Sequence, residues 1–136
     1  MKTVYIFLLL VFLQAIHSLE EIIFRFNEWF PVVTGRVHNL TGFFPVLNVN
    51  NNTFIIGNVA IVLFLFLIYF LILKNTGWAL KLASIIAFVE ILNGAAHLTG
   101  ALIFRQYYPG CVSGIGLIIV GAMYLKRKKK IRNNYV

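Results

Sequence analysis

Long apolar runs, separated by short polar segments, dominate the hydropathy pattern of this chain. The runs cover about residues 3–26, 54–73, 78–104 and 108–125. A helix needs about 20 apolar residues to cross the hydrocarbon core of a bilayer, so the pattern predicts four transmembrane helices. We therefore expect an all-α polytopic membrane protein, a bundle of four transmembrane helices that forms a single domain over residues 1–136.

Composition supports a membrane protein and argues against nucleic-acid binding. Hydrophobic residues make up 60% of the chain and charged residues 12%, whereas soluble domains have about 45–50% and about 25%. The net charge is +8, but six of the twelve basic residues lie in the tail at 126–136, directly after an apolar run. This placement is typical of a cytoplasmic anchor beside anionic lipid. No groove-reading motif accompanies it, so we expect the lipid bilayer as partner and no nucleic acid.

The first run resembles a secretory signal peptide at its start. Lys2 is followed by an apolar stretch of suitable length, but cleavage after Ser18 would leave Ile16 at the −3 position, where a small residue is preferred. Apolar residues also return at Ile22, beyond the charged pair Glu20-Glu21. We favour a retained first helix, with a cleaved signal as the alternative.

The segment between the first two runs is predicted to be a connecting loop. Pro31 is expected to stop the preceding helix, because proline removes a backbone donor and clashes with the previous turn. Glycine and asparagine are frequent from there to Thr53, and Phe43-Phe44 is expected to dip into the membrane interface. His38 has no second metal ligand close by in the sequence, so we interpret it as a solvated or structural histidine.

Basic residues predict the orientation of the chain. With four spans, three basic groups fall on one side of the membrane: Lys2, the pair Lys74 and Lys81, and the tail. The positive-inside rule makes this side cytoplasmic, so both termini are expected to be cytoplasmic in a multi-pass protein of the cell membrane. The remaining arginines, Arg25, Arg36 and Arg105, would then lie near the outer side.

Ionisable side chains interrupt two of the apolar runs. In the stretch His17-Ser18-Leu19-Glu20-Glu21, the imidazole and both carboxylates share one helix face, because they are spaced i, i+3 and i+4. In the third run a second polar face forms within an arc of about 60°, made by Glu90, Asn93 and His97. His17 and His97 lie roughly 20 Å and 25 Å from the inner edge. The first and third helices are therefore expected to pack together at these faces.

Imidazole and carboxylate groups at membrane depth are candidates for a functional site. They are suitable ligands for zinc, iron or manganese, and they also form proton donor–acceptor pairs. We expect a metal- or acid/base-dependent enzyme acting on an apolar or lipid-like substrate, with an unidentified divalent metal as possible cofactor. Its catalytic groups or ligands would be His17, Glu20, Glu21 and His97. The alternatives are passage of ions or small solutes, and a helper protein whose buried polar network only holds its helices.

The turn before the last run carries further candidate residues: Arg105, Tyr107, Tyr108, Pro109 and Gly110. Pro109 can open the last helix, Gly110 permits a tight approach, and a tyrosine hydroxyl could join the site. Arg105 could balance the carboxylates or extend outward to the interface. The single cysteine, Cys111, cannot form an intramolecular disulfide and is interpreted as a small residue near a helix start.

Three motifs in this order resemble a known family. The HxxEE stretch at residues 17–21, the later His97 and the Tyr107-Tyr108-Pro109-Gly110 segment are similar to those of the HXXEE family of integral membrane proteins. The resemblance extends from about residue 15 to 125. It implies that the family's motif positions are His17, Glu20, Glu21, His97, Tyr107, Pro109 and Gly110. It implies no reaction, because the function of the family is uncharacterised, but it favours a retained first helix, since cleavage near Ser18 would cut the motif.

Overall fold

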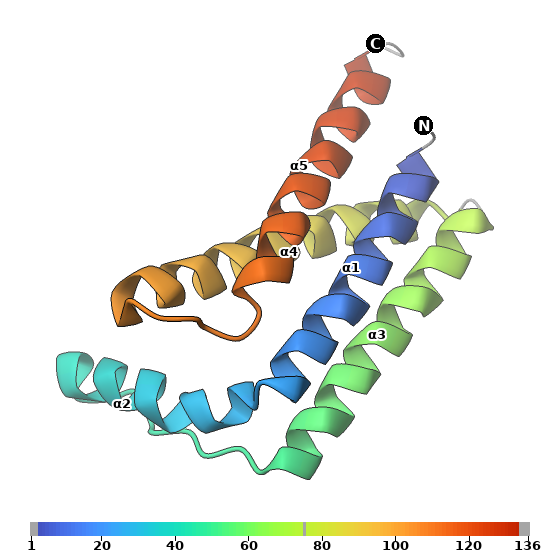
Figure 1. The fold of residues 1–136 in the computed structure, drawn as a ribbon. Helices are drawn as coiled ribbons and strands as arrows, with labels where there is room; N and C mark the ends of the chain where they lie inside the picture. The colour runs from blue at the N-terminus through green and yellow to red at the C-terminus, as the bar shows by residue number, and fades with distance from the viewer. Residues whose placement is uncertain (1–2, 75, 134–136) are drawn as a thin grey trace.

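The computed structural model describes residues 3–74 and 76–133, with side chains described as far as Arg127. Over these residues the chain is 85% helical and has no β-strand, which confirms the all-α prediction. The elements in chain order are α1 (Thr3–Ile23), the short 3-10 helix η1 (Phe26–Trp29), α2 (Phe30–Thr41), α3 (Asn51–Leu73), α4 (Gly77–Phe104) and α5 (Cys111–Asn133), as Figure 1 shows. Cys111 is the first residue of α5, as expected of a residue near a helix start.

Three of the described helices, α1, α3 and α4, are long and apolar enough to cross a membrane. The apolar part of α5 is shorter, because the basic run begins at Lys126. The predicted bundle of four transmembrane helices is therefore matched only in part. In Figure 1 the axes of α1, α3 and α5 are roughly aligned, with α1 antiparallel to the other two, whereas α4 crosses behind α1 and α5.

The crossing of α4 and α5 depends on glycines. A Cβ atom at Gly94 would clash with the carbonyl oxygen of Gly114, and one at Gly121 would lie 2.8 Å from the Ala87 carbonyl oxygen. Small residues at such positions let two helix backbones approach closely, which favours association inside a bilayer. This close contact brings the polar half of α4 next to the start of α5.

Helix α1 packs between α3 and α5 and supplies the centre of the core. Phe7, Leu10 and Val11 of α1 are fully buried, and Leu117 and Tyr124 of α5 are equally inaccessible. The Phe7 and Tyr124 rings lie 5.7 Å apart between centroids. In a bilayer, van der Waals packing of this kind holds helices together, because lipid tails are as apolar as the side chains. The packing fixes the rotation of α1 and therefore the direction of its polar face.

The prediction that Pro31 stops a helix is wrong. Helix α1 ends earlier, at Ile23, and Arg25 turns the chain with a left-handed conformation (φ 51°). Pro31 lies in the first turn of α2, where the missing N–H has no helical partner to lose. Part of the predicted loop is consequently helical, and the first span is shorter than the predicted residues 3–26.

The part of the predicted loop that remains non-helical lies between two well-defined helix caps. Gly42 ends α2 with φ 75°, a left-handed conformation that glycine adopts without strain. The side chain of Asn50 accepts a hydrogen bond from the Thr53 amide at 2.8 Å and caps the start of α3. His38 is exposed, with its Nδ1 2.7 Å from the Phe44 carbonyl oxygen, so it takes a local structural role as expected. Phe43 is 83% exposed.

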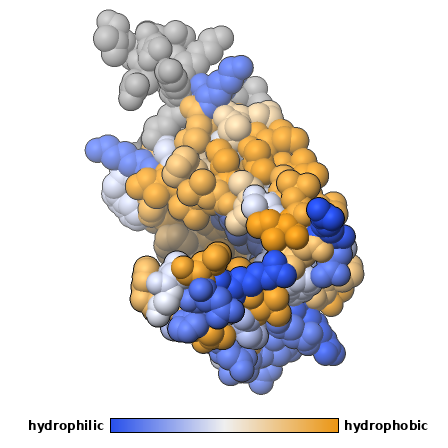
Figure 2. Space-filling model, turned by 90° about the vertical axis from the view of Figure 1, so that its left-hand side faces the viewer, coloured by the Kyte–Doolittle hydropathy of each residue, from blue (hydrophilic) through white to orange (hydrophobic). Residues whose placement is uncertain are grey.

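The outer surface of the helices is apolar. In Figure 2, hydrophobic residues cover most of the upper and middle part of the face, and hydrophilic residues gather toward the lower end. Helix α3 contributes strongly to this character, with Ile56, Leu63 and Leu67 all more than half exposed. A large exposed apolar surface of this kind is typical of a protein face that contacts lipid. The surface therefore agrees with the three candidate membrane spans.

Candidate functional site

Two polar faces, one on α1 and one on α4, meet at three side chains. One donor atom each from His17, Glu21 and His97 lies within 4.8 Å of the others. Glu21 Oε1 lies 3.0 Å from His97 Nε2 and 3.6 Å from His17 Nε2. All three side chains are buried, and the two imidazole rings stand nearly perpendicular, with centroids 4.7 Å apart. We call these three residues the His/Glu cluster.

Gly110 makes room for both imidazoles of the cluster. It has φ +88°, a conformation that other residues rarely adopt, and a Cβ atom there would lie 2.6 Å from His97 Nδ1 and 2.7 Å from His17 Cε1. The sequence suggested a tight approach at this glycine, and the structure shows what it approaches. The turn before α5 therefore closes directly over the two histidines.

The hydrogen bond of His97 to the backbone indicates which of its ring nitrogens carries the hydrogen. Its Nδ1 lies 2.5 Å from the carbonyl oxygen of Pro109. A carbonyl oxygen can only accept, so Nδ1 carries the hydrogen and donates it. In the neutral ring, Nε2 then presents its lone pair toward Glu21.

A longer chain of hydrogen bonds orients His17. The Ser113 hydroxyl donates to Glu20 Oε2 at 2.5 Å, which uses its single hydrogen. Its oxygen can therefore only accept from His17 Nδ1, which lies 2.8 Å away. The amide nitrogen of Asn93 lies 3.2 Å from His17 Nε2 and donates to it. Both contacts assign the Nδ1–H tautomer, so Nε2 of His17 carries the lone pair of the ring. Asn93 donates to that lone pair here, and a metal ion bound by His17 would take the place of Asn93.

The cluster thus brings three electron-pair donors together: two imidazole Nε2 atoms and one carboxylate oxygen. Such an arrangement is stable when a proton or a cation lies among the donors. Two histidines and one carboxylate form the protein ligand set of one class of catalytic zinc sites and of many non-haem iron sites. Each Nδ1–H is held by a protein acceptor, which is how metal-binding histidines are usually oriented. The cluster can hold a divalent metal or share a proton.

Glu20 lies beside the cluster but binds a different partner. Its carboxylate accepts hydrogen bonds from the Tyr107 hydroxyl at 2.6 Å and from three backbone amides at the start of α5: Gly110 at 3.1 Å, Val112 at 3.3 Å and Ser113 at 2.9 Å. An anion is favoured at a helix N-terminus, where amides are unpaired and the helix dipole is positive. Consecutive residues on a helix point about 100° apart, so the two glutamates face different neighbours.

The family described as "Protein of unknown function with HXXEE motif" matches residues 8–125. The chain belongs to the HXXEE family. The matched region contains the His/Glu cluster, Glu20 and the turn before α5, so the resemblance inferred from the three motifs is confirmed. No curated protein and no solved structure matches the chain.

The turn that follows α4 in this HXXEE protein holds the remaining predicted residues. Tyr107 donates to Glu20, and burial together with this hydrogen bond raises the pKa of its hydroxyl above the ordinary value. Tyr108 is buried beside Gly100 and stacks on Phe104 with ring centroids 5.6 Å apart. Arg105 is exposed and ends α4 in a left-handed conformation (φ 54°). Pro109 precedes α5 and, through its carbonyl oxygen, orients His97.

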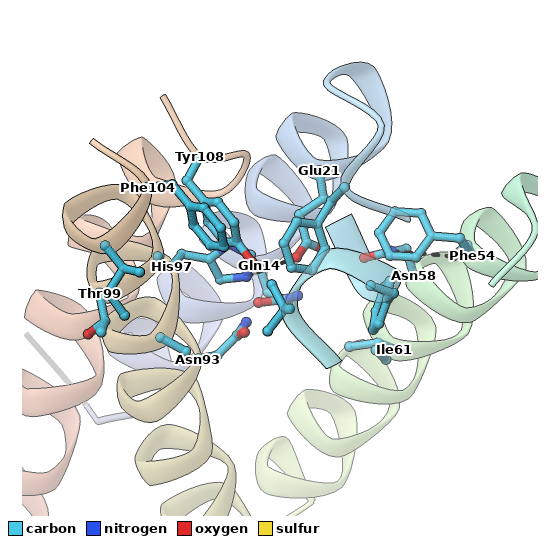
Figure 3. A pocket seen from close by; sticks show the side chains of 16 residues that line it. Gln14, Glu21, Phe54, Asn58, Ile61, Asn93, His97, Thr99, Phe104 and Tyr108 are labelled. Carbon is cyan, nitrogen blue, oxygen red and sulfur yellow. Dashed lines mark hydrogen bonds and ion pairs between the residues drawn. The ribbon is translucent and has the colours of Figure 1, made fainter. Parts of the chain in front are cut away.

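The cluster opens onto a cavity of about 670 Å³. Glu21 and His97 line it, and the side chains of Gln14 and Asn93 reach into the same space from α1 and α4 (Figure 3). Residues of α3 also line it, and aromatic rings from η1, α2 and the α4–α5 turn complete the lining. The cavity therefore combines a few polar groups with mostly apolar walls, as small-molecule sites do.

Neither Ser113 nor Gln14 is among the residues predicted from the sequence. Both are neutral polar residues, which are common in helices and give no signal of their own. A serine in the first turn of a helix that follows a Pro-Gly pair was the only available indication of Ser113. Glu90 and Asn93 do lie on the polar face of α4: Asn93 contacts His17, and Glu90 is buried closer to the start of the helix.

Proposed function

We propose that this HXXEE protein is a membrane-embedded enzyme in which His17, Glu21 and His97 bind a divalent metal and act on an amphipathic, lipid-like substrate. The observation that carries the proposal is the convergence of two oriented Nε2 atoms and one carboxylate oxygen in a buried site beside an apolar cavity. Three protein ligands leave a coordination position for water or substrate. A metal bound there would polarise a substrate oxygen or activate a water molecule.

In this proposal Glu20 is a positioning residue. Its carboxylate is engaged by the start of α5 and by the Ser113 hydroxyl, which in turn accepts from His17. Carboxylates that hold a ligand histidine through a hydrogen-bonded neighbour fix its tautomer and direction. Glu20 would therefore act on the metal only through His17.

We also propose a four-span topology with both termini cytoplasmic. The start of α1, the end of α3, the start of α4 and the end of α5 lie toward the same end of the molecule (Figure 1). The apolar half of α5 packs against α1, with Leu117 and Tyr124 fully buried, so it shares the layer of the other three spans. Positive charge at Lys74, Lys81 and the tail supports a cytoplasmic location for that end. The His/Glu cluster then lies in the outer half of the bilayer.

Metal analysis of the purified full chain tests the metal site. After incubation with zinc and removal of excess, we expect about one zinc per chain by inductively coupled plasma mass spectrometry, as three-ligand sites bind a single ion. His17→Ala and His97→Ala should lose it. His38→Ala is the matched control, because this histidine is exposed and bonded only to a local carbonyl oxygen. Equal zinc content in all four proteins, or none in the wild type, would overturn the proposal.

One observation favours a second candidate, a structural polar network without catalysis. Five hydrogen bonds tie Glu20 to the α4–α5 turn and the start of α5, and such bonds can serve only to fix helix packing. A network of this kind predicts that the wild type binds no metal and that the His17→Ala/His97→Ala double variant loses thermal stability. The enzyme proposal predicts metal in the wild type.

A further inference from the structure

A second cavity, of about 590 Å³, adjoins the first between α3 and α4. The two cavities share Gln14, Ile61 and Asn93, so they adjoin, and we call the two together the α3–α4 groove. Apolar side chains of α3 and α4, including Leu65 and Ile86, make most of its wall. The groove leads from the His/Glu cluster toward the middle of the predicted spans.

Two buried polar atoms on residues that line this second cavity have no hydrogen-bond partner. They are Oε1 of Gln14 and Oε2 of Glu90, on side chains that are 3% and 6% exposed. The amide nitrogen of Gln14 donates to Ser18 at 3.3 Å, which orients the side chain and leaves its oxygen unpaired. An unpaired buried oxygen is costly in an apolar environment, and a group that donates hydrogen bonds to it removes that cost.

The charges around the groove restrict which group can bind these oxygens. Among the described residues that line the two cavities none is lysine or arginine, whereas two, Glu21 and Glu90, carry carboxyl groups. An anionic head group would meet these carboxyl groups without a compensating side chain. An amine supplies several donors and a charge of the opposite sign.

We propose that the second cavity binds the head group of a single-chain aliphatic amine, with the amine between Gln14 and Glu90 and its hydrocarbon chain along the α3–α4 groove. About 10 Å of helix separates Glu90 from His97, so the reacting bond would lie several carbon atoms from the amine. The inference deepens the proposed function, because it names the substrate class. It rests on that function only for the fate of the bound amine, since amine binding itself requires no metal.

Competition photolabelling of the full chain in lipid nanodiscs tests this site. The probe is dodecylamine carrying a diazirine at the chain end, and the competitors are dodecylamine, dodecanol and dodecanoate, which share one chain length. We expect labelled peptides from α3 and α4, and competition by dodecylamine about tenfold stronger than by dodecanoate. Equal competition by all three compounds would overturn the proposal, because it would mean that the head group is not recognised.

Two variants sharpen the test. Glu90→Gln should weaken competition by dodecylamine about tenfold, and Gln14→Leu should weaken it as well. Glu28→Gln makes the same chemical change on the exposed surface, where Glu28 pairs with Arg25, and it should leave competition unchanged. If Glu90→Gln does not fold, Gln14→Leu alone decides. Undiminished amine binding in the folded variants contradicts the proposal.

The outcome is separable from that of the metal site. His97→Ala should lose zinc and still be labelled, because the amine contacts are on Gln14 and Glu90. Labelling in a protein that never binds metal would support the amine site and refute the metal enzyme. Zinc binding without head-group selectivity would support the metal site and refute the amine site.

Discussion

Glu20 and Glu21 are adjacent in the sequence, carry the same functional group and lie in different surroundings. Glu20 accepts five hydrogen bonds from the α4–α5 turn and the start of α5. Glu21 faces two imidazole nitrogens and a cavity. The comparison shows that one half of the HxxEE motif is tied to the fold, while the other half remains available for chemistry. The direction of each side chain around α1, and not its identity, makes the difference.

The largest effect on zinc affinity should come from a substitution of Glu21. Glu21→Gln removes the anionic ligand while keeping the shape of the side chain. We expect zinc affinity to fall by more than about 100-fold, since changes to groups beyond the ligands already cost 10- to 100-fold. Competition titration with a zinc chelator measures the affinity. Unchanged affinity would mean that Glu21 is not a ligand and would remove the distinction between the two glutamates.

Gly110 contacts the surroundings of both glutamates: its amide donates to Glu20, and its Cα lies against His17 and His97 of the His/Glu cluster. Gly110→Ala places a methyl group against both imidazoles in a backbone conformation with φ +88°, so we expect a loss of about 2 kcal/mol in unfolding free energy together with weaker zinc binding. Denaturation in mild detergent, followed by circular dichroism, measures the stability. Gly35→Ala is the control, because the added atom meets nothing within 4 Å and Gly35 lies inside α2. That control should be neutral or slightly stabilising.

Glu20 should give the opposite pattern to Glu21. Glu20→Ala removes an anionic helix cap, and we expect it to lower the unfolding free energy by about 1–2 kcal/mol. Zinc should still bind, though less tightly, because His17 loses part of its support. Parallel measurements of melting temperature and zinc content decide this. A Glu20→Ala protein of normal stability that binds no zinc would identify Glu20 as a ligand and contradict its proposed role.

Ser113 should show the smallest effect on zinc binding. It contacts both Glu20 and His17 but is not itself a proposed ligand of the metal. In Ser113→Ala the hydrogen bond to His17 Nδ1 is lost, so we expect zinc affinity to decrease by about tenfold, with the same stoichiometry. The same chelator titration measures it. An effect larger than that of Glu21→Gln would reverse the proposed order of roles.

The sequence predicted the parts of the fold that depend on long apolar runs. The limits of α4 and α3 agree closely with the predicted runs, because a span of this length cannot be mistaken for a soluble element. Helix α2 was missed, since Pro31 is equally compatible with the end of one helix and the first turn of another. Only the tertiary contacts of the surrounding segments distinguish these two positions.

The sequence also predicted which two helices bring their polar faces together. It did not predict which of the two glutamates faces the histidines and which faces α5. The spacing of His17, Glu20 and Glu21 places all three on one face, yet a face is wide enough for two neighbours. Whether Glu20 turns toward His97 or toward α5 depends on where the α4–α5 turn packs, which local pattern does not encode. For the same reason Ser113 gave no signal before its partners were located.

X-ray absorption spectroscopy of the zinc-loaded full chain shows whether both histidines of the His/Glu cluster bind the metal. We expect a shell of nitrogen and oxygen ligands at about 2.0–2.1 Å with the scattering pattern of two imidazoles. His97→Ala should reduce that pattern to one imidazole or abolish binding, and His38→Ala should leave it intact. A zinc shell without imidazole scattering, or one that is identical in His97→Ala, would contradict a metal site built from the His/Glu cluster.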